Sequence, residues 1–430
     1  MRIAICTLGC KVNQYETQAI ERELLRRGHS LVDFEDEADA YIVNTCSVTA
    51  ISDKKSRQML RRAKSRNPDA VVAACGCYAQ THADDVAALE VDVLAGTNDR
   101  AGFLDLVEKA AREKTRIVHL DDALHRHDFE VLPAGGLAAR TRAMLKIEDG
   151  CTNFCTYCII PFARGPVRSL SMEEAGKQVK LIVNDGYKEL VLTGIEISSY
   201  GKDVPEQVAL IDLVELVCRT APELRVRLGS LEPRTITRDF CERASRLGNL
   251  CPHFHLSLQS GCDATLKRMN RRYDTARYAE SCALLRGYFD DPAITTDLIT
   301  GFPEETEAEF AETLSFIERC GFADMHIFPY SIRPGTKAAA LPQVEKHVKE
   351  ERAARAAEVA RAMKAAYLDR CVGKTFPVLF EGTETAGSAG HAPNYTEVYI
   401  ENNGLQNELR AVRILRSDGE RLYGALEETR

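Results

Sequence analysis

Residues 143–158 read Ala-Met-Leu-Lys-Ile-Glu-Asp-Gly-Cys-Thr-Asn-Phe-Cys-Thr-Tyr-Cys, and this stretch decides how the central part of the chain folds. An apolar run typical of a buried parallel strand leads directly into Cys151, Cys155 and Cys158, spaced C-x3-C-x2-C. Three thiolates so close together can hold one face of an iron–sulfur cluster. The next cysteine is Cys218, so such a cluster would keep one iron open for chemistry. The alternative is a chance grouping of structural or zinc-binding cysteines.

The strand in that stretch is the first of six that alternate with helical patterns. The predicted strands are residues 144–148, 189–193, 225–228, 253–258, 294–300 and 324–329. The predicted helices between them include residues 172–184, 207–219 and 305–320. Six βα units over roughly 190 residues are too few for the usual eightfold barrel, so an open or partial barrel is expected. Its working surface should be the C-terminal ends of the strands, where the three cysteines lie.

The N-terminal part shows a similar alternation, which predicts an α/β fold with a small doubly wound parallel sheet. Predicted strands lie at residues 2–8, 39–44, 70–74 and 92–95, and predicted helices at 13–27, 51–66 and 80–89. Cys10, Cys46 and Cys77 each follow a strand, and the carboxyl ends of such strands meet at one crevice. We therefore expect these thiols to converge on a second cluster. Cys75 is still in the apolar run and is expected in the core, and a buried-thiol core is the alternative for the whole set.

The C-terminal part changes character after a long charged, Ala-rich helical pattern at residues 346–370. Its β-rich runs lie at residues 375–380, 397–400, 411–415 and 422–425. With a hairpin turn at Asp418-Gly419, they predict a small all-β barrel. A Pro/Gly break at residues 133–136 separates the first two parts. The expected domains are residues 1–125, 138–368 and 371–430.

Composition limits the class of protein. The 430 residues are 45% hydrophobic and 28% charged, the profile of a folded globular chain rather than a disordered or fibrous one. No apolar run approaches the ~20 residues of a membrane span, and the first residues run straight into a strand pattern rather than a signal peptide. Fifteen cysteines in a long chain of this kind favour reduced thiols, and hence a cytoplasmic protein with metal or redox chemistry.

The net charge of −8 means that any binding of nucleic acid needs a local basic patch. Residues 54–66 carry seven cations on a predicted helix, and Lys54, Arg57 and Arg61 are the candidate contacts to a phosphate backbone. An ordinary solvated helix face is the alternative. Arg333 follows the sixth barrel strand and is a candidate contact near the substrate, with a plain exit turn as the alternative.

Known motifs accompany these patterns. The spacing C-x3-C-x-aromatic-C, with Tyr157 as the aromatic residue, resembles the radical S-adenosylmethionine (radical SAM) signature. Segments similar to those of the methylthiotransferase family lie at residues 7–17, 44–49, 75–80, 227–230, 256–261 and 301–306. The resemblance covers nearly the whole chain and includes a C-terminal module like the TRAM β-barrel. The first segment, Thr-Leu-Gly-Cys-Lys-Val-Asn-Gln-Tyr-Glu-Thr, looks like the branch that acts on N6-threonylcarbamoyladenosine in tRNA.

The resemblance implies the cofactors and their sites. The barrel cysteines would bind a [4Fe–4S] cluster whose open iron chelates S-adenosylmethionine (SAM), and reductive cleavage of SAM would yield a 5′-deoxyadenosyl radical. The N-terminal cysteines would hold an auxiliary [4Fe–4S] cluster that carries the sulfur, which a second SAM would methylate. The residues expected to contact SAM are Tyr157, Gly194, Glu196, Arg227 and Ser257.

The resemblance also implies partners. The substrate would be a tRNA anticodon stem-loop, with the methylthio group placed at C2 of the modified adenosine at position 37. An electron donor such as flavodoxin or ferredoxin and a sulfur source are implied, and a monomer without membrane contact is expected. One alternative is the same chemistry on N6-isopentenyladenosine in tRNA or on an aspartate of a ribosomal protein. Another is a non-catalytic iron–sulfur electron carrier or RNA-binding sensor.

Overall fold

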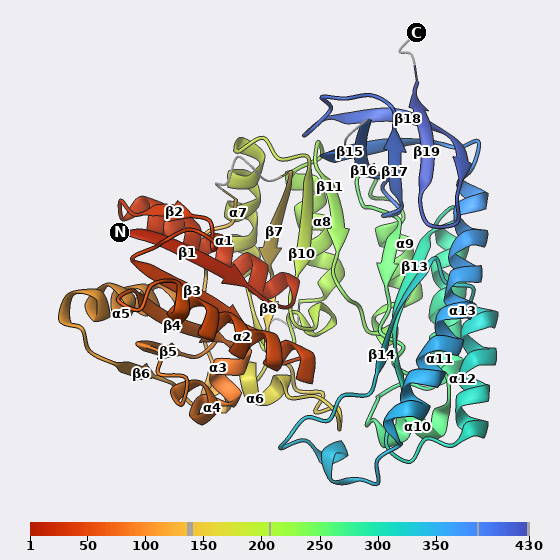
Figure 1. The fold of residues 1–430 in the computed structure, drawn as a ribbon. Helices are drawn as coiled ribbons and strands as arrows, with labels where there is room; N and C mark the ends of the chain where they lie inside the picture. The colour runs from red at the N-terminus through yellow and green to blue at the C-terminus, as the bar shows by residue number, and fades with distance from the viewer. Residues whose placement is uncertain (136–140, 206–207, 385–386, 428–430) are drawn as a thin grey trace.

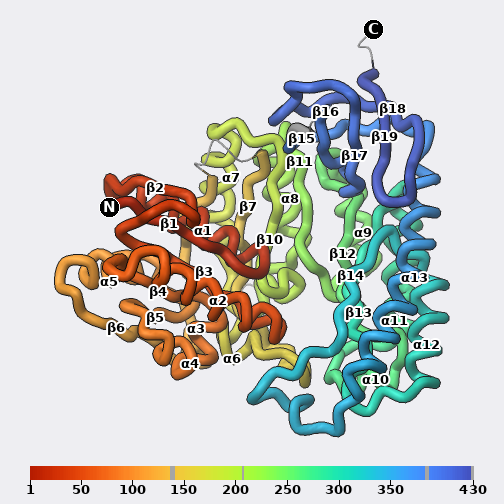
Figure 2. Tube along the Cα trace, in the orientation of Figure 1, coloured from red at the N-terminus to blue at the C-terminus, as the bar shows by residue number. Residues whose placement is uncertain are grey.

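The computed structural model describes residues 1–135, 141–205, 208–384 and 387–427, so the break predicted at 133–136 lies partly outside the described residues. Figure 1 shows an N-terminal sheet with its helices, a central set of strands backed by helices, and a C-terminal β-barrel. The N-terminal sheet lies beside the first central strands, and the C-terminal barrel covers one end of the central part (Figure 2). In these described ranges, no helix is both long and apolar enough to cross a membrane.

The N-terminal part is a six-stranded parallel sheet in the order β2-β1-β3-β4-β5-β6. Its strands are β1 (Arg2–Thr7), β2 (Ser30–Val32), β3 (Ala40–Thr45), β4 (Val71–Gly76), β5 (Val93–Ala95) and β6 (Ile117–His119). Its helices are α1 (Lys11–Arg26), α2 (Ala50–Arg66), α3 (Cys77–Thr81), α4 (Ala83–Ala87), α5 (Arg100–Glu113) and the 3-10 turn η1 (Ala123–His125). Apolar side chains of α1 and α5 pack on one face, and those of α2, α3 and α4 on the other. The doubly wound sheet predicted from the sequence is confirmed.

Two edge strands and one helix break are not visible in the sequence pattern. β2 and β6 have three residues each with largely exposed or half-exposed side chains, so they lack the buried apolar run that marks the other strands. The helix predicted at residues 80–89 is divided between α3 and α4, because His82 leaves the helical conformation (φ −132°, ψ 49°).

The central part contains two three-stranded parallel sheets, β7-β10-β11 and β12-β13-β14. The strands are β7 (Arg142–Lys146), β10 (Glu189–Thr193), β11 (Arg225–Leu228), β12 (His253–His255), β13 (Ala293–Thr300) and β14 (Asp324–Pro329). Parallel bridges pair Val226 with Leu250 and Leu231 with Leu256, and so join the two sheets between β11 and β12. The result is the six-stranded partial barrel that the sequence predicts.

Short and long helices surround this barrel. They are α6 (Ile160–Arg164), α7 (Met172–Asn184), α8 (Leu210–Thr220), α9 (Arg238–Ala244), α10 (Asp263–Arg268), α11 (Thr275–Tyr288) and α12 (Glu307–Cys320), with the 3-10 turns η2 (Ile197–Ser199), η3 (Pro233–Thr235) and η4 (Lys337–Ala340). A two-residue strand, β8 (Glu148–Asp149), pairs with β9 (Arg168–Ser169) just after β7. The first predicted barrel strand therefore ends two residues earlier than expected, and β8 leads into the cysteine loop.

The long helix α13 (Lys346–Cys371) leads into a closed barrel in the order β15-β16-β17-β19-β18. Its strands are β15 (Thr375–Glu384), β16 (Gly387–His391), β17 (Glu397–Ile400), β18 (Leu409–Ser417) and β19 (Leu422–Leu426). β18 and β19 pair antiparallel around the predicted Asp418-Gly419 turn. The small residues of β16 do not resemble a strand, but a Cβ on Gly390 would lie 2.3 Å from the carbonyl oxygen of Leu379, so close backbone approach explains them. The barrel is confirmed, and the three domain limits stay a prediction.

Candidate active site

Three N-terminal cysteines lie at the carboxyl ends of neighbouring strands. Cys10 follows β1 and caps α1, Cys46 follows β3, and Cys77 follows β4 and begins α3. These strands are adjacent, and the order reverses between β1 and β3, so their ends form the crevice where open α/β sheets bind ligands. Burial raises the pKa of Cys77 to about 12, and the nearby Cys10 and Cys46 add to that rise. The structure thus brings the predicted triad together, while Cys75 is buried in the core as expected.

Two glycines permit this close approach. Gly9 (φ +98°) precedes Cys10, and a Cβ on it would lie 2.6 Å from the Sγ of Cys46. Gly76 (φ +96°) turns the chain out of β4 before Cys77. Cys10 is exposed while the other two thiols are buried, so the triad opens on one side. Buried thiols with raised pKa values stay protonated at neutral pH unless a metal displaces the proton, and a metal-ligand set fits this arrangement.

The barrel triad lies on a single loop between β8 and α6. Cys151, Cys155 and Cys158 are each half-buried, and burial raises the pKa of Cys158 to about 12, with Cys155 adding to the rise. Phe154 has a left-handed backbone (φ +47°), and Asn270 donates to its carbonyl at 3.0 Å. The loop therefore curls and gathers the three thiols.

One barrel cysteine has a charged partner that the sequence does not single out. Nη1 of Arg271 donates to the Sγ of Cys155 at 3.2 Å, and its Nε donates to the hydroxyl of Tyr273 at 3.0 Å. That hydroxyl donates to the carbonyl of Ser257 at 2.5 Å, which brings this predicted SAM contact next to the triad. Arg271 stands in a run of basic residues, so nothing in its sequence context distinguishes it.

Gly194 and Glu196 follow β10 and lie against the start of the cysteine loop. The backbone N–H of Glu196 donates to Oε2 of Glu148 at 2.8 Å, and its carboxylate accepts from the hydroxyl of Ser199 at 2.6 Å. Burial raises the pKa of the Cys151 thiol, and the charge of Glu196 adds to that rise, so this carboxylate is within electrostatic reach of the triad. A Cβ on Gly194 would lie 2.8 Å from Glu148, so glycine is required there. The second oxygen of Glu148 is buried without a hydrogen-bond partner in the described part of the chain.

The remaining two predicted SAM contacts differ in their surroundings. Tyr157 lies on the cysteine loop with its ring edge-on to Phe302, the ring centroids 6.4 Å apart. Arg227 is buried and donates to Glu189 at 2.8 Å and to the carbonyl of Pro393 in the C-terminal barrel at 2.9 Å. A buried acid at the start of β10 needs a cation, and Arg227 supplies it. Arg227 therefore links the two barrels in this structure, and its contact with SAM stays a prediction.

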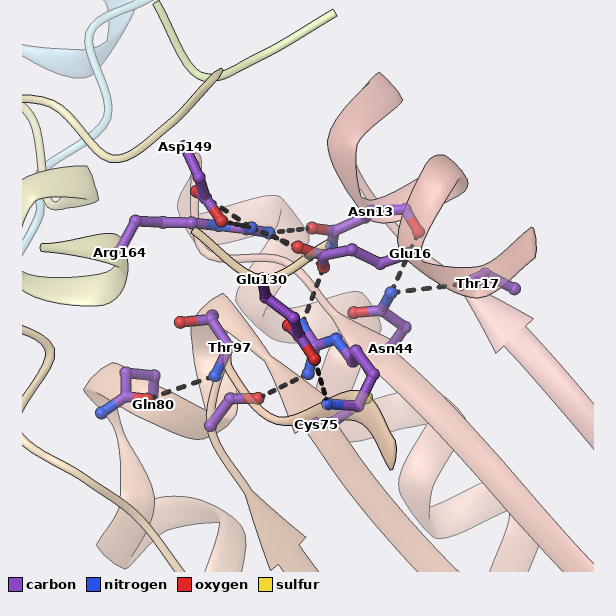
Figure 3. Close-up of polar contacts among 12 residues, drawn as sticks. Asn13, Glu16, Thr17, Asn44, Cys75, Gln80, Thr97, Glu130, Asp149 and Arg164 are labelled. Carbon is purple, nitrogen blue, oxygen red and sulfur yellow. Dashed lines mark hydrogen bonds and ion pairs between the residues drawn. The ribbon is translucent and has the colours of Figure 1, made fainter. Parts of the chain in front are cut away.

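A buried ionic network connects the N-terminal sheet with the barrel (Figure 3). Arg164 ends α6, and its Nη2 donates to Oδ1 of Asn13 at 2.8 Å while its Nη1 pairs with Glu16. Asp149 lies on its other side at 3.3 Å. Burial alone would raise the pKa of Glu16, but Arg100 and Arg164 lower it to about 2. Asn13 and Glu16 are three residues apart on one face of α1, which is the single sequence signal for this network.

Two consecutive residues, Arg164 of this network and Gly165, contact the two triads. Burial raises the pKa of Cys77, whereas the charge and hydrogen bond of Arg164 oppose that rise, so the guanidinium touches the N-terminal triad. The carbonyl of Gly165 accepts from the N–H of Cys151 at 3.0 Å in the barrel triad. The two triads therefore lie on either side of one short segment at the junction of sheet and barrel.

Comparisons with known proteins identify the family. Residues 2–96 match the model of Uncharacterized protein family UPF0004, and residues 145–317 match that of the Radical SAM superfamily. The chain is 39% identical over 423 residues to threonylcarbamoyladenosine tRNA methylthiotransferase MtaB of Bacillus subtilis (strain 168), covering 96% of this chain and 94% of that protein. The chain belongs to the radical SAM methylthiotransferase family.

Other relatives of this methylthiotransferase carry two different names. The MtaB protein of Thermotoga maritima is 35% identical over 96% of this chain and 94% of its own. The tRNA-2-methylthio-N(6)-dimethylallyladenosine synthase of Clostridium botulinum (strain Loch Maree / Type A3) is 33% identical over 88% and 85%. The radical SAM methyltransferase TsrM of Kitasatospora setae, solved with cobalamin and a [4Fe-4S] cluster, superposes with a TM-score of 0.57 over 79% of this chain and 74% of its own. At 12% identity, that likeness shows the fold alone.

Only some of the cations on the basic helix α2 of this methylthiotransferase are exposed and unpaired in the described part of the chain. Lys54 and Arg61 are exposed on α2, close after Cys46 in the chain. Arg57 donates to the hydroxyl of Tyr78 at 2.6 Å and lies over its ring. Farther along the helix, Arg62 and Arg66 both pair with Glu35. The exposed cations therefore lie both near the start of α2, at Lys54, and in its second half, at Arg61.

Arg333 is not a free contact. Its Nη1 pairs with Asp53 at 2.6 Å and donates to the carbonyl of Ser47 at 3.3 Å, and the side chain is buried. Next to it, the N–H of Ala50 donates to the hydroxyl of Ser331 at 2.9 Å. Arg333 ties the exit of the last barrel strand to the loop after Cys46, because the buried carboxylate of Asp53 needs a cation. Its contact with the substrate stays a prediction.

Proposed function

We propose that this methylthiotransferase places a methylthio group on C2 of N6-threonylcarbamoyladenosine at position 37 of tRNA. Relatives named for this substrate, at 32–39% identity over most of the chain, support it. The observation that carries the chemistry is the pair of cysteine triads on either side of Arg164 and Gly165. An aromatic C–H bond offers no acidic proton, so general-base chemistry is a poor route and a radical cofactor a good one.

Two [4Fe–4S] clusters fit the two triads, each with three thiolates and one open iron. The proposed ligands are Cys151, Cys155 and Cys158 for one cluster and Cys10, Cys46 and Cys77 for the other. Arg271 beside Cys155 and Arg164 beside Cys77 offer positive charge to anionic clusters. When bound, the clusters and two SAM molecules supply the radical that removes the C2 hydrogen and the methylthio group that replaces it.

The chain itself would orient SAM and exclude water. We assign Glu196 to the SAM amino group, because its carboxylate is held by Ser199 and lies beside the barrel triad. Gly194 lets Glu148 approach the chain closely at this point, and the unpaired oxygen of Glu148 fits a bound donor. Tyr157, packed on Phe302, and Ser257, bonded to Tyr273, are the other two residues that we assign to SAM. The buried network around Arg164 fixes the separation of the two reacting partners.

The cations of α2, of which Lys54 and Arg61 are exposed, support contact with an anticodon stem-loop. Lys54, Arg57 and Arg61 would bind backbone phosphates, which fix the position of the RNA without reading its sequence. A flavodoxin or ferredoxin would donate electrons, a sulfur donor would recharge the auxiliary site, and the enzyme would act as a monomer in the cytoplasm.

Nucleoside analysis of total tRNA from a deletion strain tests the substrate. We expect 2-methylthio-N6-threonylcarbamoyladenosine to vanish while its unmethylthiolated precursor accumulates. Loss of the methylthio form of isopentenyladenosine, or of no methylthio nucleoside, would contradict the proposal. To separate an enzyme from an electron carrier, 5′-deoxyadenosine is measured after reduction of the reconstituted protein with SAM. Its absence would exclude radical chemistry.

A further inference from the structure

Two imidazoles and a carboxylate from adjacent strands meet on one face of the partial barrel. His255 ends β12, Asp297 lies in β13 and His326 lies in β14. Nε2 of His255 is 3.2 Å from Oδ2 of Asp297, and Nδ1 of His326 is 3.2 Å from Oδ1 of the same carboxylate. Each of the three residues offers a ligand atom that lies within 4.8 Å of the other two. We call these residues the His–Asp–His group.

The strand register explains why these side chains meet. Asp297 pairs directly with His326 in the parallel ladder. Thr295, two residues earlier on β13, pairs with His255. Paired residues of neighbouring strands point to the same side of a sheet, and so do residues two apart on one strand. Leu298, which follows Asp297, is buried in the apolar core with side chains of α11 and α12. The His–Asp–His group therefore lies on the opposite, inner face of the barrel.

The separations within the His–Asp–His group fit a zinc ion. Zinc bonds to imidazole nitrogen and carboxylate oxygen are about 2.0–2.1 Å long, so two ligands of a tetrahedral ion lie about 3.3 Å apart. Both nitrogen–oxygen separations in the group are already 3.2 Å. A pair within 4.8 Å would have to close by at most about 1.5 Å to reach the tetrahedral separation. The side chain of His326 is 66% exposed, so it can turn by that much without disturbing the core.

A threonine hydroxyl orients one of the two imidazoles. Nδ1 of His255 is 3.0 Å from Oγ1 of Thr295, and the same hydroxyl is 3.3 Å from Nε2 of His253. When this hydroxyl donates to His253, it accepts from Nδ1 of His255, and the lone pair of His255 is then on Nε2. Metal-ligating histidines characteristically donate their other ring N–H to an oxygen in this way. That lone pair faces the carboxylate of Asp297, an arrangement that a metal ion between them would stabilise.

We propose that His255, Asp297 and His326 bind one zinc ion. Two imidazoles and a carboxylate are a ligand set of zinc sites with three protein ligands, in which a fourth position stays open for water. Imidazole and carboxylate ligands also set this site apart from the two cysteine triads, whose thiolates suit iron–sulfur clusters.

The zinc would have a different task from the clusters. Zinc is not oxidised or reduced in proteins, so it would take no part in electron transfer. It would join β12, β13 and β14 on the inner face, and its open position would lie on the exposed side of His326. The inference goes beyond the proposed function and does not depend on which nucleoside is the substrate.

The test measures zinc in the full-length, cluster-loaded enzyme, because empty cysteine triads would themselves bind zinc. The enzyme is freed of loosely bound metal with a chelator, incubated with Zn²⁺ without oxygen, desalted and submitted to elemental analysis. We expect one zinc ion per chain in addition to the iron of the clusters. X-ray absorption at the zinc edge should show nitrogen and oxygen neighbours at about 2.0–2.1 Å and no sulfur at about 2.3 Å.

Three variants test the ligands and their support. His326→Ala is the principal variant, because an exposed side chain can be removed without loss of the fold. It should abolish stoichiometric zinc, and so should Asp297→Asn, which removes the negative charge. Thr295→Val keeps all three ligands but removes the hydroxyl that orients His255. It should raise the Kd for zinc about tenfold to a hundredfold, measured by competition with a chelating dye.

A matched control lies in the N-terminal part. Nδ1 of His125 is 2.8 Å from Oδ2 of Asp122, so these two residues form a histidine–aspartate pair like those of the His–Asp–His group. Both side chains are largely exposed. His125→Ala therefore removes one imidazole from such a pair and should change neither the zinc content nor the Kd for zinc.

Several outcomes would overturn the site. A wild-type enzyme without stoichiometric zinc would leave the His–Asp–His group as hydrogen-bonded side chains. Zinc that is retained in His326→Ala, or sulfur neighbours at the zinc edge, would place the ion elsewhere. An additional iron atom that is lost in His326→Ala, in place of zinc, would assign ferrous iron to these ligands instead. None of these results depends on methylthiolation, so failure of the proposed function would leave the zinc site standing.

Discussion

The two cysteine triads reach similar arrangements by different routes. The barrel triad lies within eight residues on one loop, and its shape depends on local backbone geometry around Phe154. The N-terminal triad is collected from the ends of β1, β3 and β4, and its shape depends on the order of a whole sheet. Spacing alone therefore reveals the first triad, whereas only a correct topology reveals the second. Each triad can be disturbed separately.

The largest expected effect comes from removing one ligand of each triad. Cys155→Ala should abolish both 5′-deoxyadenosine formation and methylthiolation, because the open iron that holds SAM is lost. Cys77→Ala should abolish methylthiolation alone. Iron analysis should fall from about eight to about four atoms per chain in either variant, since each triad holds one four-iron cluster.

Cys75→Ala is the matched control, because that thiol is buried two residues from Cys77 but packs in the apolar core. It should keep both clusters. If Cys77→Ala kept its full iron content, the N-terminal triad would not be a cluster site.

The next largest effect comes from replacing Arg164. This residue contacts the N-terminal triad, and Gly165, the next residue, contacts the barrel triad. Arg164→Met leaves Glu16 and Asp149 buried without their shared cation, which should lower the free energy of unfolding by about 3–5 kcal/mol. Urea denaturation measures it. Arg219→Met removes an exposed ion pair to Glu215 on α8 and should change that free energy by less than about 1 kcal/mol.

A double variant sharpens this result. Glu16→Gln combined with Arg164→Met should cost less than the sum of the two single losses, because the two side chains pair. Additive losses would mean that the network does not connect α1 with α6 as described.

An acid titration tests the same network. The folded pKa of Glu16 is lowered from 4.5 to about 2, so its stabilising contribution is present above about pH 4.5 and is lost as the pH falls through 2. The difference in free energy of unfolding between wild type and Glu16→Gln should therefore shrink between those pH values. Glu113→Gln on the exposed end of α5 should differ from wild type by the same small amount throughout. A constant difference for Glu16→Gln would contradict the assignment.

The smallest expected effect is a loss of affinity for tRNA when the cations of α2 are replaced. Replacing Lys54, Arg57 and Arg61 by Glu should raise Kd for tRNA about tenfold and reduce its dependence on salt, because phosphate contacts release counterions. Lys109→Glu on α5, which covers the opposite face of the sheet, is the control. An unchanged salt dependence would leave α2 as a solvated helix.

Much of the fold could be predicted from the spacing of apolar residues, and the cysteine sites from the rule that ligands bind at the carboxyl ends of parallel strands. Cys77 could be chosen over Cys75 because Cys75 still lies in the apolar run, and the structure buries Cys75 in the core and turns the chain at Gly76 (φ +96°) before Cys77. Arg227 and Arg333 show where this reasoning ends. Both stand near strand ends, yet each is drawn to a buried acid, Glu189 or Asp53, and ion pairs between distant segments leave no pattern in sequence.

The residues that were not predicted also depend on contacts between distant segments. Arg271 bonds to Cys155 on another loop of the barrel, and Arg164 acts on Cys77 in the N-terminal part, so each contact joins segments that are far apart in the sequence. β16 has the composition of a turn, and its pairing depends on the closed barrel around it. Local chemistry was therefore predictable, and partners supplied by tertiary packing were not.

The central claim is that both triads are needed for one reaction at one place. It is tested most directly by giving the cluster-loaded enzyme SAM, a reductant and an anticodon stem-loop bearing threonylcarbamoyladenosine, and measuring the methylthiolated nucleoside by mass spectrometry. Wild type should form it, and Cys77→Ala should form none while still releasing 5′-deoxyadenosine. Product from Cys77→Ala, or a fully loaded wild-type enzyme that leaves this nucleoside unchanged, would contradict the account.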